Sequence, residues 1–106
     1  MIAVSLSTEG GSFRAKAFGH ANTAPFGQDI VCAAVSVLVC SFAAVLYDAE
    51  ETGKLISLDI RLEHGDAEIF CKPKPAHRKE VAAWLRYFEA GMDALAERYP
   101  EAVLVN

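Results

Sequence analysis

The sequence predicts an α+β protein, a two-layer α/β sandwich in which two helices cover one face of an antiparallel sheet. Two pairs of segments alternate apolar and polar residues with the period of a β-strand, and glycine-containing turns join the members of each pair. A long segment with the apolar spacing of a helix follows each pair. The expected order is therefore ββαββα, with a possible short strand at the C-terminus.

The first hairpin is expected at the N-terminus. Residues 2–7 and 13–17 carry apolar side chains at every second position. Between them, Glu9-Gly10-Gly11-Ser12 supplies two glycines, which permit the positive φ angles of a tight turn. Residues 19–28 contain two glycines and a proline, and we expect a loop there.

The first helix is expected from the capping residue Asp29 to about Glu51, with Gly53 as its stop. A wide apolar stripe is predicted to face the core: Val35, Leu38, Val39, Phe42 and Leu46. Residues 30–46 are apolar but short for a membrane span, and they lack flanking Lys or Arg. We interpret them as a core helix and expect no membrane association.

The second half repeats the pattern. Residues 56–62 alternate as a strand, His64-Gly65-Asp66 is a turn, and residues 67–71 form the paired strand. A second helix is expected from about Ala76 to Arg98, with a core stripe of Val81, Trp84, Leu85, Phe88, Met92 and Leu95. Val103 and Val105 indicate the possible closing strand.

Length and composition predict a single domain over residues 1–106 in the cytoplasm. The chain has 106 residues and a net charge of −4, so direct nucleic-acid binding is not expected. Three cysteines are an odd number, and no secretory signal is recognisable, which favours a reducing compartment. Because the sequence has no Cys-x-x-Cys motif and no closely spaced histidine pair, we expect neither a metal nor a cofactor.

The segment from His20 to Ser36 is the most informative for chemistry. If Asp29 caps the helix, Cys32 lies in its first turn, where backbone N–H groups and the helix dipole favour a thiolate. The same N–H groups are possible donors to an oxyanion. His20 lies twelve residues earlier and across a loop, where it is a candidate base for the thiol. Taken alone, these residues favour packing for Cys32 and solvation for His20 over catalysis, because cysteine is often a buried small hydrophobe.

The exact string resembles a known family. Gly19-His20-Ala21, the spacing of twelve to Cys32, and Asp-Ile-Val-Cys-Ala-Ala-Val-Ser over residues 29–36 are similar to the ribosomal-processing cysteine proteases called Prp. The resemblance implies a homodimeric endopeptidase that removes the N-terminal extension of a large-subunit ribosomal protein precursor, cutting after an aromatic residue. It also implies that Cys32 is the nucleophile and His20 the general base, with support from Gly19, Asp29 and Ser36.

Other interpretations remain open at this stage. The loop sequence at residues 22–26 departs from the commonest pattern of the family. Phe26 in this loop is a possible contact for an aromatic substrate side chain. A non-catalytic ribosome-associated peptide- or RNA-binding module is the main alternative, and a redox or acyl-transfer thiol enzyme is the third. The remaining cysteines and histidines are expected to be structural or solvated, with Cys40 and Cys71 in the core and His64 and His77 facing solvent.

Overall fold

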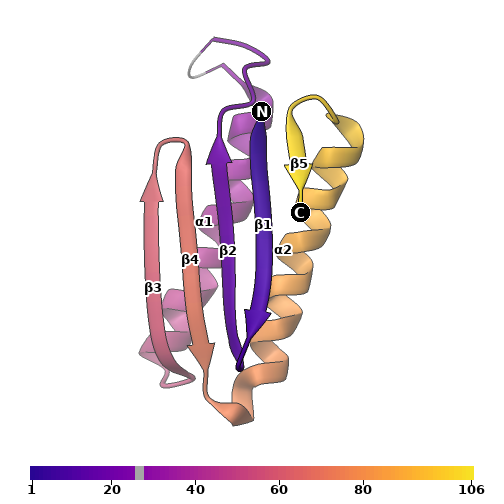
Figure 1. Ribbon diagram of the computed structural model, residues 1–106. Helices are drawn as coiled ribbons and strands as arrows, with labels where there is room; N and C mark the ends of the chain where they lie inside the picture. Colours follow the sequence, from indigo (N-terminus) through magenta and orange to yellow (C-terminus); the bar gives the residue numbers. More distant parts are fainter. Residues whose placement is uncertain (26–27) are drawn as a thin grey trace.

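The structure is a computed structural model that describes residues 1–25 and 28–106. Phe26, the possible substrate contact, lies outside the described residues. The chain forms the two-layer sandwich that the sequence predicts, with both helices on the same face of the sheet (Figure 1). The elements are β1 (Ile2–Glu9), β2 (Ser12–Gly19), α1 (Ile30–Glu51), β3 (Leu55–Glu63), β4 (Asp66–Pro73), a 3₁₀ turn η1 (Pro75–His77), α2 (Arg78–Arg98) and β5 (Val103–Val105).

The sheet has the strand order β3-β4-β2-β1-β5. The hairpins β1–β2 and β3–β4 are antiparallel and join through an antiparallel β2–β4 pairing. The closing strand is present, but β5 pairs with β1 in parallel, so the sheet is mixed and not wholly antiparallel. The parallel pairing arises because α2 carries the chain back along the sheet before β5 begins, and β5 then runs in the direction of β1 (Figure 1).

Helix α1 packs against the sheet beside α2. Its bounds and its glycine stop match the prediction: the Gly53 N–H donates to the Glu50 carbonyl at 3.1 Å, with a φ of +77° at Gly53. By length and composition alone α1 could cross a membrane, but one side of it packs in the core. The buried residues of α1 are Val31, Val35, Val39, Phe42, Ala43, Leu46 and Ala49.

The core also fixes α2 against α1. The rings of Phe42 and Phe88 stack with centroids 5.1 Å apart, and Met92 is fully buried. Val81, Phe88 and Met92 are buried as predicted, whereas Trp84, Leu85 and Leu95 pack at the edge of the core. This packing holds the first turn of α1 in a fixed position at one end of the sheet.

Candidate active site

Three segments meet at the end of the sandwich where α1 begins. They are the end of β2 with the loop after it, the first turns of α1, and the turn between β3 and β4, which consists of His64 and Gly65 (Figure 1). The β2–β4 register pairs Phe18 with Asp66, so this β3–β4 turn lies beside the end of β2. The Gly19 N–H donates to the Gly65 carbonyl at 2.8 Å and ties the two segments together.

Asp29 is the N-cap of α1, as predicted. Its Oδ1 accepts hydrogen bonds from the Val31 N–H at 2.9 Å and the Cys32 N–H at 3.0 Å. Its Oδ2 accepts from the backbone N–H groups of Thr23, at 2.7 Å, and Ala24, at 3.3 Å. One carboxylate therefore caps the helix and also anchors the loop that leads to it.

Hydrogen bonding keeps Asp29 ionised. Bonds from the Thr23 side chain, and then from the Cys32 N–H, lower the pKa of Asp29 from 3.8 to about 2, against the opposing effect of burial. The carboxylate is therefore present at any pH at which a thiol enzyme would work.

Cys32 and His20 line the same cavity. The cavity has a volume of about 400 Å³, and its walls are His20, Asn22, Ala24, Asp29, Cys32, Ala33 and Ser36. Cys32 is half-buried and His20 is exposed, so the thiol and the imidazole both border a space open to a substrate. The four residues expected nearest the chemistry, namely His20, Asp29, Cys32 and Ser36, are brought together at this cavity.

The expected oxyanion donors are not available in this structure. The N–H groups of Val31 and Cys32 donate to the Asp29 side chain, and the Ala33 N–H donates to the Asp29 carbonyl at 3.0 Å. The structure therefore does not support these three N–H groups as oxyanion donors, because the side chain and the carbonyl of the capping residue Asp29 already accept their hydrogen bonds.

Gly19 supports the site through its backbone. Its φ is +108°, and a Cβ on it would collide with the Met1 carbonyl oxygen. Only glycine fits this close approach between the end of β2 and the start of β1. The next residue, His20, is thereby directed from the end of β2 toward the cavity.

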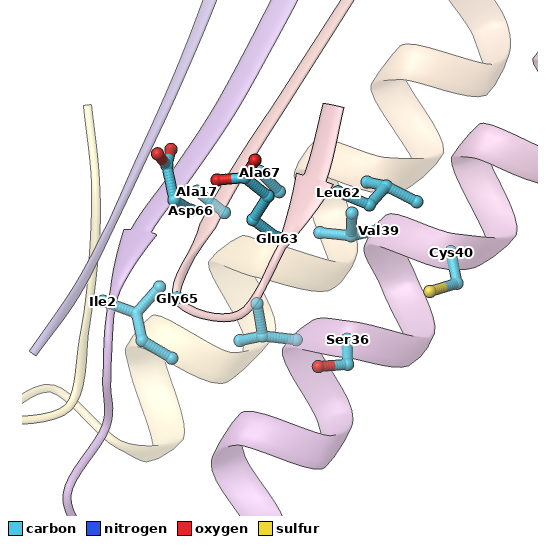
Figure 2. Close-up of a pocket in the computed structure, with 11 residues that line it drawn as sticks. Ile2, Ala17, Ser36, Val39, Cys40, Leu62, Glu63, Gly65, Asp66 and Ala67 are labelled. Atoms are coloured by element: carbon cyan, nitrogen blue, oxygen red, sulfur yellow. The ribbon is translucent and has the colours of Figure 1, made fainter. Parts of the chain in front are cut away.

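A second, smaller cavity adjoins the first at Ser36. It has a volume of about 170 Å³ and lies between α1 and the β3–β4 turn (Figure 2). Figure 2 shows Ser36 and Cys40 projecting from the same side of α1, with Gly65 in the turn. Ile2, Ala17, Val35, Val39, Leu62 and Ala67 make most of its wall apolar, and Glu63 and Asp66 add two carboxylates.

The other cysteines divide between surface and core. Cys71 is fully buried as predicted, and burial raises the pKa of its thiol from 9.0 to about 11. The prediction that Cys40 lies in the core was wrong, because it is exposed and lines the smaller cavity. Eight residues after Cys32, it lies about two helical turns further along a similar face, and that face borders the cavities instead of the sheet.

Two contacts of His20 were not predicted from the sequence. The His64 side chain is exposed as expected, but its ring centroid also lies 4.7 Å from that of His20. Asn22 has a φ of +57°, a conformation that asparagine tolerates better than most residues, and its Nδ2 donates to the His20 carbonyl at 3.3 Å. An asparagine in a loop was the only signal for the second contact, and nothing local indicated the first.

His77 lies away from this site and is less exposed than expected. His77 is half-buried at the start of α2, where its Nδ1 lies 4.0 Å from Glu80. Over residues 1–25 and 28–106, no group of three His, Cys, Asp or Glu residues is arranged to hold a metal ion.

The fold and the cavity together define a protein with a thiol and an imidazole at the start of a core helix, the general arrangement of a cysteine peptidase. The model of the cysteine protease Prp family matches residues 1–104. The chain belongs to this family and is a cysteine protease. A search of curated proteins finds no match.

Solved structures agree with this fold. The ribosomal processing protease Prp from S. aureus, in complex with a covalently linked product peptide, is 21% identical, with a TM-score of 0.78 over 100% of this chain and 98% of that one. The same protease with a substrate peptide gives 20% identity and a TM-score of 0.72 over the same shares. SMU.848 from Streptococcus mutans is 27% identical, with a TM-score of 0.71 over 100% of this chain and 92% of that one.

Proposed function

We propose that this protease removes the N-terminal extension of a large-subunit ribosomal protein precursor, with Cys32 as the nucleophile and His20 as the general base. The observation that carries the proposal is that these two side chains border one open cavity at the start of α1. The S. aureus relative, named a ribosomal processing protease, supports the substrate class, and its complex with a covalently linked product peptide supports covalent catalysis.

The proposed reaction needs only these two side chains and water. The His20 imidazole accepts the Cys32 thiol proton, and the thiolate attacks the carbonyl carbon of the scissile bond. The tetrahedral intermediate collapses, the C–N bond breaks, and the imidazolium returns its proton to the leaving amine. Water, deprotonated by His20, then hydrolyses the thioester to the acid and frees the thiol.

Asp29 and Ser36 support the reaction by position and take no part in bond making or breaking. Asp29 accepts hydrogen bonds from the Val31 and Cys32 N–H groups. These bonds fix the backbone of the first turn of α1 and thereby the position of Cys32 at the cavity. Ser36 lies one turn beyond Cys32, where the two cavities join. Asp29 thus positions the residue that carries the thiol, and Ser36 leaves the junction of the two cavities open to a peptide.

Cleavage of a synthetic peptide that spans the extension junction tests the proposal. Cys32→Ala and His20→Ala are expected to abolish cleavage, while the matched controls Cys40→Ala and His77→Ala retain it, because neither control residue borders the larger cavity. Turnover by Cys32→Ala at the parental rate would refute the dyad. The alternative of a peptide- or RNA-binding module predicts binding without turnover, and membership of a protease family argues against it.

We further propose a cytoplasmic homodimer. All three cysteines are free thiols, which suits a reducing compartment such as the cytoplasm.

The surface proposed for the dimer is an apolar groove of about 330 Å³ between α1 and α2, which exposes Val37, Val45 and Tyr87 and which a second copy would cover. Sedimentation equilibrium should give twice the chain mass, and Tyr87→Lys should shift the sample toward monomer. A wild-type protein that sediments as a monomer at assay concentrations would refute the dimer.

A further inference from the structure

The imidazole of His20 rests directly on the backbone of the β3–β4 turn. Gly65 has a φ of +72°, and a Cβ built on it would lie 2.5 Å from Nε2 of His20 and 2.6 Å from Cε1. An unbonded carbon does not approach a nitrogen or another carbon this closely. The position of the ring therefore requires that residue 65 has no side chain.

Two further contacts hold the same pair of segments together. The His64 ring packs against the His20 ring, with centroids 4.7 Å apart and planes tilted by 44°. The hydrogen bond from the Gly19 N–H to the Gly65 carbonyl fixes the residue before His20 to the turn. The turn residues His64 and Gly65 therefore hold both the ring of His20 and the backbone just before it.

We propose that the β3–β4 turn is the positioning element for the base, with His64 and Gly65 acting as positioning residues for His20. The proposal rests on the proposed role of His20 in the reaction. The turn supplies a flat surface at Gly65 and a ring contact at His64, and together these orient the imidazole toward the cavity shared with Cys32. Neither turn residue needs to touch the substrate for this role.

The size of the effect follows from the contact distances. To move from 2.5 Å to an ordinary contact of 3.4 Å, the imidazole must retreat by about 1 Å from an added methyl group. Because the side chain of His20 can rotate, this retreat changes the place of the ring more than it disturbs the fold. A misplacement of about 1 Å typically lowers the rate of an enzyme by up to about 100-fold.

Gly65→Ala tests the proposal, with Gly53→Ala as the matched control. Both glycines have a similar positive φ, of +72° and +77°, so both variants carry the same backbone strain. A Cβ at Gly53 meets only the Lys74 Nζ, at 3.8 Å, far from the site. With the precursor peptide, Gly65→Ala should lower kcat about 10- to 100-fold with KM within about twofold of wild type. Gly53→Ala should leave both constants within about twofold of wild type, with a similar fall in Tm. Equal kcat values in the two variants would overturn the role of Gly65.

His64 offers a second test that does not depend on the folding of Gly65→Ala. His64→Ala should lower kcat by about tenfold, and His64→Phe, which retains a ring against His20, should restore most of it. Parental kcat in His64→Ala, or an equal loss in both variants, would overturn the ring contact. His20→Ala distinguishes failure of the proposed base from failure of its positioning by the turn. If it remains active, the proposed base fails; if it is inactive while Gly65→Ala matches Gly53→Ala, only the positioning proposal fails.

Discussion

Differential alkylation of the three cysteines should separate the candidate nucleophile from a packing cysteine. Only the thiolate reacts with iodoacetamide, and burial raises the pKa of Cys71 from 9.0 to about 11. Two pKa units correspond to a factor of 10², so below pH 9 the thiolate population of Cys71 is about 100-fold smaller than that of an unburied thiol. Full burial of the side chain hinders access of the reagent as well.

The assay is alkylation at pH 7.5, read by peptide mass spectrometry at successive times. Cys32 and Cys40 border open cavities and should be labelled, whereas Cys71 should react at least about 100-fold more slowly. Cys40→Ser removes the competing surface thiol, so that the remaining fast phase reports Cys32 alone. In concentrated urea all three should react at similar rates. Native labelling of Cys71 as fast as Cys40, or protection of Cys32 equal to that of Cys71, would refute this reasoning.

Three further variants test the core, the cap and the cavity. Met92→Ala should lower the free energy of unfolding in urea by about 2–5 kcal/mol, because Met92 is fully buried. Asp29→Asn should weaken the dependence of Tm on pH in the acid range. The depressed pKa makes ionised Asp29 stabilising above pH 3.8, and this stabilisation is lost as the pH falls toward about 2. An unchanged slope of Tm against pH in the variant would contradict the role of Asp29 as the cap. Ser36→Leu should reduce peptide cleavage tenfold or more by filling the junction of the two cavities. The control is Ala44→Leu, at an exposed position of α1, and equal activity of the two variants would place the substrate elsewhere.

The parts of the site that the sequence predicted are local in the chain. An aspartate before an apolar helical pattern determines both the start of α1 and the place of Cys32 in its first turn. Ser36, one turn later, was expected only from the resemblance to the Prp family. The position of Cys40 was missed because helical spacing gives relative angles but does not say which face meets the sheet.

The parts that could not be predicted depend on strand pairing across the chain. Period-two patterns identify the two hairpins, yet they do not specify that β2 pairs with β4. That pairing alone brings Gly65 and His64 to His20, more than forty residues away in sequence. The direction of β5 likewise follows from the course of α2 and not from its own three residues.

Mass analysis of the acyl-enzyme shows directly whether the Cys32 sulfur is the nucleophile. An acid-quenched mixture of protein and precursor peptide should contain the intact chain plus the mass of the N-terminal product acid less one water, and peptide mapping should place this acyl group on the Cys32 sulfur. This adduct should form in Cys40→Ala and be absent from Cys32→Ala. An adduct on another residue, or cleavage by Cys32→Ala, would contradict it.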